Sequence, residues 1–213
     1  MLRKIAVREV CIKSKVQQFS KEKILSNKNL FSINDGWLTE VIQHPSPFFT
    51  PRLPSDSIEL LVVHNISLPA GQFNTPYIND LFLGKLDCDA DKTFSDLKGV
   101  EVSAHCLIKR DGTITQYVSF NDKAWHAGIS EFKGKDKCND FSIGIELEGC
   151  DDIAYEDIQY KQLAKVAASI QQAYPLIQDS HIKGHCDIAP GRKTDPGDIF
   201  HWQIFHQYLL AYK

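Results

Sequence analysis

The stretch Ser142-Ile143-Gly144-Ile145-Glu146-Leu147-Glu148 alternates small or polar residues with apolar ones. That period of two is typical of a β-strand with two different faces, and it places Glu146 and Glu148 on the same face. The run Leu60-Leu61-Val62-Val63 is apolar throughout and bounded by turn residues, which predicts a strand buried on both faces. Together the two segments indicate a central sheet.

A hairpin and a long helix are expected beside these strands. Val102–Ile108 and Thr113–Tyr117 are separated by a turn that contains Asp111-Gly112, and Asp-Gly between two alternating runs predicts a β-hairpin. From Tyr155 to Tyr174 apolar residues recur at helical spacing, and Pro175 ends the element. This segment predicts an amphipathic helix that packs on the sheet.

The last part of the chain adds a short strand, a loop and a helix. Ile182–His185 is predicted to be a strand that leads into the loop Cys186–Gly197, and Trp202, Phe205 and Leu209 mark one face of a C-terminal helix. Strands in a run with helices outside predict an α/β fold, a single domain with a central mixed β-sheet flanked by helices.

Three segments are expected to lie outside this framework. Residues 1–30 are polar and Lys-rich and predict an N-terminal extension of unknown role, so the domain is expected at residues 31–213. The Pro-rich passage His44–Pro54 predicts a surface loop. Gly71–Asp96 predicts a loop with a short helix at Tyr77–Leu83, which would form one wall of a cleft.

Length, charge and apolar content exclude several classes of protein. The chain has 213 residues, 43% hydrophobic and 24% charged, with a formal net charge of -3. No apolar run approaches the roughly 18 residues of a membrane span, so we expect no membrane partner. The slightly acidic balance argues against nucleic acid as a partner, because phosphate contacts need a basic face. We expect a monomer.

The cysteine pattern indicates reduced thiols. The six cysteines are single and scattered, without a Cys-x-x-Cys pair, so neither a zinc ribbon nor a thioredoxin-like site is expected. The N-terminus contains charged residues and no apolar signal segment. Both observations favour a cytoplasmic location. The cysteines are Cys11, Cys88, Cys106, Cys138, Cys150 and Cys186.

Two histidines and one aspartate suggest a metal site. His64 and His185 stand at predicted strand ends, and Asp195 follows on a Pro/Gly-rich loop. Two imidazoles and a carboxylate with a fourth position open to water form the ligand set of a catalytic zinc. The pattern alone leaves a second interpretation open, in which these are hydrogen-bonded core or rim residues.

Five motifs, in order from about Phe31 to the C-terminus, resemble the AmpD family of 1,6-anhydro-N-acetylmuramyl-L-alanine amidases, and more distantly phage amidases and peptidoglycan recognition proteins. The motifs are Leu61-Val62-Val63-His64-Asn65-Ile66-Ser67-Leu68-Pro69, Val102-Ser103-Ala104-His105-Cys106-Leu107-Ile108, Ala124-Trp125-His126-Ala127-Gly128, the segment 139–149 around Glu146, and the segment 184–197 from Gly184-His185 to Asp195-Pro196-Gly197.

The resemblance implies a zinc site in a surface cleft and a specific hydrolytic reaction at that site. The family's zinc ligands fall on His64, His185 and Asp195, its catalytic glutamate on Glu146 and its catalytic lysine on Lys193. The reaction implied is hydrolysis of the amide between (anhydro-)N-acetylmuramic acid and L-alanine in small soluble muropeptides, during peptidoglycan recycling. In some bacteria the family thereby lowers the signal that induces β-lactamase.

Substrate contacts are expected at three further residues. We expect Trp125 to stack on the sugar, Arg192 to grip a stem-peptide carboxylate, and Asn65 to hydrogen-bond the substrate. Many relatives have an arginine before the Val-Ser-Ala-His motif, whereas this chain has Glu101, which would repel a carboxylate. His105 and His126 are expected to be structural or to support the ligands.

Two alternatives to a recycling amidase stay open at this point. One is a broad-specificity amidase that cuts polymeric cell wall, which the absence of a signal segment disfavours. The other is a peptidoglycan-recognition module that binds without cutting. Such a module typically lacks a metal ligand or the catalytic pair, whereas all five residues are present in this chain.

Overall fold

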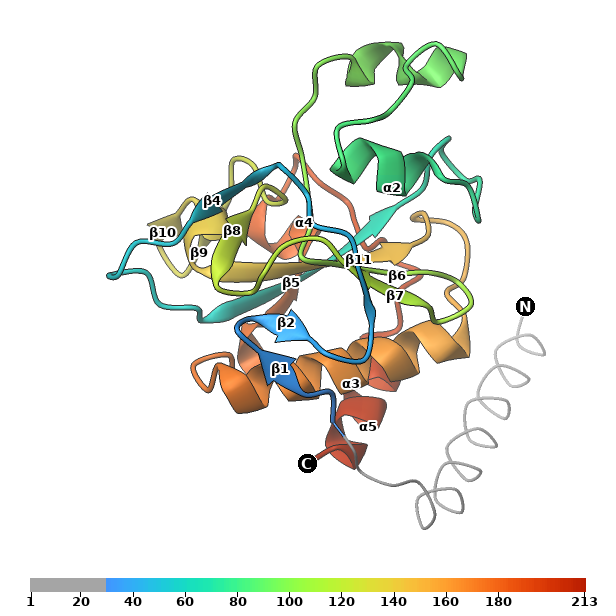
Figure 1. Ribbon diagram of the computed structural model, residues 1–213. Helices are drawn as coiled ribbons and strands as arrows, with labels where there is room; N and C mark the ends of the chain where they lie inside the picture. The colour runs from blue at the N-terminus through green and yellow to red at the C-terminus, as the bar shows by residue number, and fades with distance from the viewer. Residues whose placement is uncertain (1–29) are drawn as a thin grey trace, which may run out of the picture.

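The computed structural model describes residues 30–213 and shows a six-stranded sheet in the order β12-β5-β11-β6-β7-β3 (Figure 1). Neighbouring strands are parallel except for the antiparallel hairpin β6–β7, so the mixed sheet predicted from the sequence is confirmed. The strands are β3 (Ile42–Gln43), β5 (Leu60–Ile66), β6 (Cys106–Ile108), β7 (Ile114–Gln116), β11 (Ser142–Glu148) and β12 (Ile182–Gly184).

Smaller elements surround this sheet. Three two-stranded ribbons pair β1 (Ile33–Asn34) with β2 (Trp37–Leu38), β4 (Phe49–Pro51) with β8 (Asp122–Ala124), and β9 (Glu131–Phe132) with β10 (Lys135–Asp136). The α-helices are α2 (Tyr77–Phe82), α3 (Asp157–Ala173), α4 (His185–Ile188) and α5 (Trp202–Ala211); the 3₁₀ turns are η1 (Lys92–Leu97), η2 (Cys138–Asp140) and η3 (Asp179–His181).

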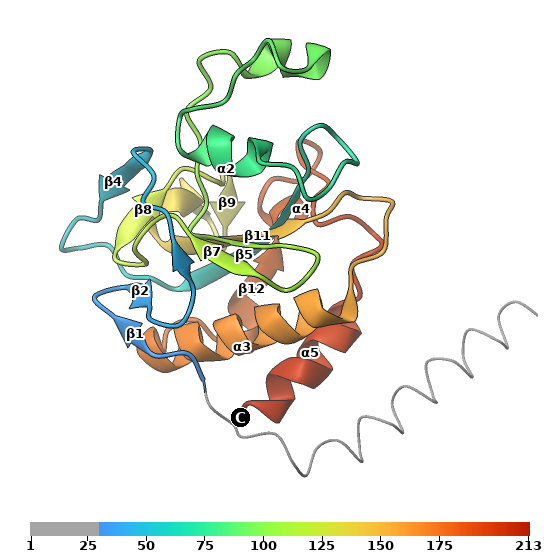
Figure 2. The same ribbon diagram turned by 45° about the vertical axis from the view of Figure 1, so that its right-hand side comes forward.

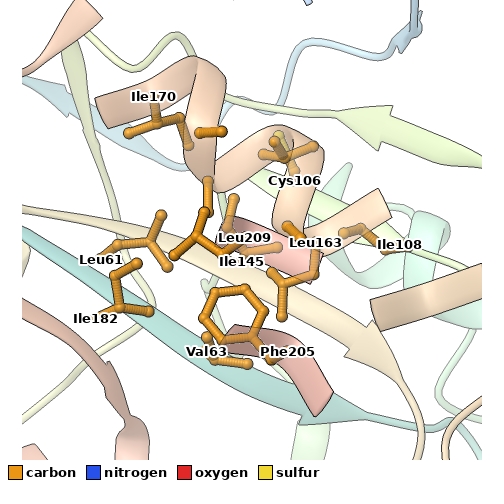
Figure 3. Packing of buried hydrophobic residues seen from close by; sticks show 14 of the residues in the cluster. Leu61, Val63, Cys106, Ile108, Ile145, Leu163, Ile170, Ile182, Phe205 and Leu209 are labelled. Atoms are coloured by element: carbon orange, nitrogen blue, oxygen red, sulfur yellow. The ribbon is translucent and has the colours of Figure 1, made fainter. Parts of the chain in front are cut away.

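The alternation in β11 separates two layers. Ile143, Ile145 and Leu147 face the main core, which also contains apolar residues of α3 and α5. Figure 3 shows this core from close by. Leu163 and Ile170 of α3 pack, together with Phe205 and Leu209 of α5, against side chains of β5 and β6 in the sheet. Figure 2 shows α3 and α5 together on one side of the sheet and α2 on the other. The polar face of β11 therefore points away from the two long helices.

The opposite face carries two smaller apolar clusters. In one, Leu107 of β6 packs against Phe82 of α2. In the other, Leu60 and Val62 of β5 pack against Ile188 of α4. The run Leu60–Val63 is thus covered on both sides, as its continuous apolar character predicts.

Most expected elements are present, with shifted boundaries. The helix predicted at Tyr155–Tyr174 is α3, whose start is marked by the Glu156 N–H that donates to the Gln159 side chain at 3.0 Å. The helix expected at Tyr77–Leu83 is α2, and the C-terminal helix is α5. Both hairpin strands are shorter than predicted.

Two predictions were wrong in detail. His185 does not end a strand but begins α4, where the Asp187 carboxylate accepts the Gly184 N–H at 2.8 Å and so favours a helical turn. The Pro-rich passage is not a simple loop, because Phe49–Pro51 pairs with β8. A two-stranded ribbon tolerates Pro51, since both of its strands are edge strands and proline is compatible with an edge strand.

Several predictions lie partly or wholly outside the described residues. The extension predicted at residues 1–30 is outside them except for Leu30, and so is Cys11. The other five cysteines are free thiols. None of the helices within residues 30–213 combines the length and the apolar composition that crossing a membrane requires.

We predict that Leu163→Ala lowers the free energy of unfolding by about 2–5 kcal/mol, because it opens a cavity between α3 and the sheet. Leu210→Ala on α5 is the matched control, since Leu210 is 63% exposed and its truncation leaves no cavity. Urea unfolding of both variants measures the difference, and an equal loss in both would contradict this account of the core.

Candidate active site

Parallel pairing of three strands brings the predicted site residues to one edge of the sheet. In the β5–β11 register His64 lies opposite Glu146, and in the β5–β12 register Gly184 lies opposite Val63. His185 follows Gly184 directly and therefore emerges beside His64. Carboxyl ends of neighbouring parallel strands form the usual position of a site in an open sheet.

Three donor atoms converge at this edge. His64 Nδ1 and His185 Nδ1 are 3.0 Å apart, and each lies 3.0 Å from Asp195 Oδ2. Tetrahedral zinc with ligand distances of about 2.0–2.1 Å separates its donor atoms by about 3.3 Å. The trio therefore fits one divalent cation after only a small adjustment, and it is a candidate metal site.

The surroundings of the two histidines suit metal ligation through Nδ1. His185 Nε2 lies 3.0 Å from the Ala127 carbonyl, which only accepts, so this nitrogen carries the proton and Nδ1 keeps its lone pair. Burial lowers the pKa of His64 to about 4, against the opposing effect of its hydrogen bond with Asp195. The His64 imidazole is therefore neutral at pH 7, as metal ligation requires.

Asp195 is held as an anion. Burial alone would raise its pKa, but the adjacent rings of His185 and His64 outweigh burial and hold the pKa well below the usual range. The loop that carries it is tied down, because the Cys186 N–H donates to the Asp195 carbonyl at 3.0 Å and the Tyr155 hydroxyl donates to the Pro196 carbonyl at 2.8 Å.

Glu146 lies at the same edge of the sheet as His64, and one of its carboxyl oxygens makes no hydrogen bond within the described residues. Its Oε2 atom is buried and has no hydrogen-bond partner among the described residues. Burial and the charge of Asp195 raise the pKa of Glu146 well above its usual value, while the charge of Lys193 lowers it. A buried carboxyl group whose pKa is raised in this way is suited to proton transfer.

Lys193 is exposed and near the other site residues. Its charge lowers the pKa of both Glu146 and His64, so the ammonium lies within electrostatic range of both groups. Its main-chain N–H donates to the Ala189 carbonyl at 3.0 Å, which forms the turn before Asp195. The structure thus brings together all five residues predicted as ligands or catalytic groups.

The three predicted substrate contacts have protein partners. The Asn65 amide donates to Asp151 at 2.8 Å. The Trp125 indole stacks on Phe48 and donates to the Thr50 hydroxyl at 2.8 Å. Their roles toward substrate stay predictions.

Arg192 also has protein partners. Its guanidinium donates through Nε to the Ile129 carbonyl at 3.0 Å and through Nη2 to the Ala127 carbonyl at 2.6 Å. The arginine therefore holds the loop beside His185, and a grip on a peptide carboxylate would use its remaining donors. This second role stays a prediction.

Glu148 has a function that sequence reasoning missed. It is fully buried, and its carboxylate accepts the main-chain N–H of Asn74 at 2.6 Å and of Arg110 at 3.2 Å. It thereby joins the loop after β5 to the β6–β7 turn. A charged residue at the end of a fully buried strand is the only sequence signal of this role, because its two partners are backbone groups.

Comparison with known proteins agrees with this geometry. Residues 54–198 match the N-acetylmuramoyl-L-alanine amidase family, a range that includes all five residues at the site. The chain belongs to the N-acetylmuramoyl-L-alanine amidase family. It is 54% identical over 170 residues to the 1,6-anhydro-N-acetylmuramyl-L-alanine amidase AmpD of Salmonella typhimurium (strain SL1344), which covers 80% of this chain and 90% of the relative.

Two solved structures are similar to this amidase. The crystal structure of a selenomethionine AmpD derivative has a TM-score of 0.81 and 50% identity, covering 84% of this chain and 99% of that chain. The amidase AmiD of E. coli, in complex with anhydro-N-acetylmuramic acid-L-Ala-D-γ-Glu-L-Lys, has a TM-score of 0.52 and 30% identity, covering 74% and 60%. The family predicted from the sequence motifs is confirmed.

We predict that Glu146→Ala raises the free energy of unfolding of the metal-free amidase by about 1 kcal/mol, because it removes a buried oxygen that has no partner in the described part of the chain. Glu148→Ala, on the same face of β11, is the matched control and lowers that free energy by about 3 kcal/mol, because it leaves two N–H groups unpaired. Denaturant unfolding measures both, and a loss of similar size in the two variants would contradict the contrast.

A second prediction concerns His105, which lies in the core behind the site. Burial, with the nearby charge of Arg52, lowers the pKa of His105 to about 3. Between that pH and the unperturbed value of 6.5 the unfolded chain binds a proton that the folded protein does not, so stability falls as pH falls.

Below pH 6.5 the wild type should therefore lose up to about 1.4 kcal/mol per pH unit more than His105→Leu, which lacks this group. Urea unfolding of both metal-free proteins between pH 6.5 and pH 5 gives the two slopes. Equal slopes would show that His105 takes up its proton in the folded state.

Proposed function

We propose that this chain is a zinc-dependent amidase that hydrolyses the amide between (anhydro-)N-acetylmuramic acid and L-alanine in soluble muropeptides, during peptidoglycan recycling. The observation that carries the proposal is the buried Oε2 atom of Glu146, which has no hydrogen-bond partner within residues 30–213, together with three converging donor atoms. The AmpD name of the Salmonella relative and the substrate held by E. coli AmiD support this choice of reaction.

The donor set favours zinc as the cation. His64, His185 and Asp195 supply two neutral nitrogens and one carboxylate oxygen, which leaves a fourth tetrahedral position for water or substrate. Such an open site is catalytic in zinc enzymes, whereas structural sites use four protein ligands. Zinc, when bound, supplies a Lewis acid that polarises a carbonyl oxygen and acidifies water.

The proton is transferred by Glu146 in this proposal. Its carboxylate accepts a proton from the attacking water as the water oxygen bonds to the lactyl carbonyl carbon. It then delivers the same proton to the alanine nitrogen as the carbon–nitrogen bond breaks. The products are a muramic acid carboxyl group and a free peptide amine, and Glu146 returns to its starting state.

Lys193 stabilises charge in the same step. Its ammonium lies within electrostatic range of Glu146 and His64. A cation beside the reacting carbonyl offsets the negative charge that develops on the oxygen. The same cation favours the ionised form of Glu146, which the proton transfer needs at its start.

Substrate contacts are proposed at the rim of this site. Trp125 offers an indole face to the sugar, Asn65 offers an amide, and Arg192 offers the donors that the 127–129 loop does not use. Glu101 is exposed and would repel a nearby peptide carboxylate. We place the amidase domain at residues 31–213, with residues 1–30 as an extension, and propose a cytoplasmic monomer.

The test is release of peptide from anhydromuramyl-tripeptide by the metal-depleted and the zinc-reconstituted protein, followed by chromatography and mass spectrometry. We expect turnover only with zinc. Glu146→Gln should lower kcat by about 10²–10⁴-fold because it removes the proton acceptor, and His185→Ala should abolish zinc-dependent turnover. His201→Ala, an exposed histidine before α5, is the matched control and should keep wild-type activity.

Three results would contradict the proposal in different ways. Equal turnover by His185→Ala and wild type would remove the metal site from the reaction. Binding of the muropeptide without turnover would favour a recognition module. Release of peptide from intact cell wall as fast as from the soluble substrate would favour a broad-specificity amidase over a recycling enzyme.

A further inference from the structure

We propose that the dipeptide His126-Ala127 is a single support that orients both histidine ligands, and that His126 is a positioning residue for His64. This inference rests on the proposed zinc site and adds residues that are not ligands. Its basis is that the outward-facing Nε2 atoms of His64 and His185 meet two consecutive residues. His64 Nε2 lies 2.9 Å from His126 Nδ1, and His185 Nε2 lies 3.0 Å from the Ala127 carbonyl oxygen.

The direction of the hydrogen bonds behind His64 follows from ligation. A ligand nitrogen needs a free lone pair, so His64 Nδ1 is bare and Nε2 carries the proton. His126 Nδ1 must then accept the hydrogen bond from His64 Nε2, which leaves His126 Nε2 as a donor. It lies 3.1 Å from Ser142 Oγ, which accepts. The chain His64–His126–Ser142 therefore has only one arrangement of protons compatible with a bound metal.

The space for the His126 ring is provided by Gly144. A Cβ atom at position 144 would lie 2.4 Å from Cγ and 2.5 Å from Nδ1 of the His126 ring. Gly144 does not have a positive φ, so backbone conformation does not require glycine there. Close approach of the imidazole is the physical reason for a glycine in the middle of a buried strand.

The support is itself anchored. The main-chain N–H groups of His126 and Ala127 both donate to Asn139 Oδ1, at 3.2 and 2.8 Å. The Ala127 carbonyl also accepts from Arg192 Nη2 at 2.6 Å. The His126 side chain and the backbone of the dipeptide are thus held by separate hydrogen bonds. The two groups that contact the ligand histidines, His126 Nδ1 and the Ala127 carbonyl, are therefore rigid and restrict rotation of both imidazole rings.

His105 is a suitable comparison for His126. It lies in the same region, fully buried where His126 is partly buried, and the two rings are 5.7 Å apart. Its nitrogens, however, meet main-chain groups, the Gly144 N–H at 2.9 Å and the Asp122 carbonyl at 3.1 Å. Replacing His105 therefore tests the cost of losing a buried histidine without removing the partner of His64.

The experiment compares His126→Leu, His126→Asn and His105→Leu in the full chain. Zinc Kd is measured by competition with a chromophoric chelator, and the visible spectrum of the cobalt-loaded protein reports the geometry of the metal. Losing a hydrogen-bond partner of a ligating histidine typically weakens metal binding by about 10–100-fold, which is the effect expected for His126→Leu, together with a changed cobalt spectrum.

The conservative variant and the comparison variant separate positioning from folding. Asn Oδ1 occupies about the place of His126 Nδ1, so His126→Asn should restore most of the zinc affinity and the wild-type cobalt spectrum. His105→Leu should lower the Tm of the metal-free protein but keep the wild-type Kd and spectrum. If His126→Leu does not fold, Ser142→Ala, which removes the last acceptor of the chain, should weaken zinc binding on its own.

The outcomes distinguish this inference from the proposed function. A wild type that binds no zinc overturns both. A wild type that binds zinc, with His126→Leu equal to it in Kd and cobalt spectrum, overturns only the role of His126. Equal losses of affinity in His126→Leu and His105→Leu also overturn it, because the effect would then come from the fold and not from the partner of His64.

Discussion

The parallel pairing of β5 with β11 is the interaction on which the rest of the structure depends. Its register sets His64 opposite Glu146, and β12 on the other side of β5 delivers His185 beside them. A slip by one residue would turn every side chain of β11 to the other face. The apolar set Ile143, Ile145 and Leu147 would then lose the main core, so packing against α3 and α5 specifies the register of the site.

Strand β11 contributes to the core with one face and to the site with the other. The residues of the polar face have separate roles, since Ser142 ends the hydrogen-bond chain from His64, Gly144 leaves room for an imidazole, and Glu148 joins two loops. Glu146 alone keeps a buried oxygen without a partner among the described residues. Burial of such a group lowers stability, and this cost is concentrated where a proton acceptor is useful.

Local patterns predicted most of the framework because their causes are local. The period of two in β11, the continuous apolar run of β5, the Asp-Gly turn and the helical spacing of α3 each depend on neighbouring residues. The start of α4 at His185 and the pairing of Phe49–Pro51 with β8 were missed. The former depends on one hydrogen bond that the Gly184 N–H donates to the Asp187 carboxylate, and the latter on a strand more than 70 residues away in the chain.

The sequence by itself determined the residue types of the site and their order along the chain, and its motifs determined the family. It also determined which faces of the strands are apolar, since the side-chain period is a property of the backbone. Only the tertiary structure decided that three donor atoms meet within 3.0 Å, that Glu148 is structural while Glu146 is not, and that His126 and Ala127 stand behind both ligands. Apart from the contact between His185 and Asp195, which are 10 positions apart, those facts depend on contacts between residues 38 to 131 positions apart. Hydrophobic packing of the whole sheet brings these residues together, and no local pattern encodes the contacts.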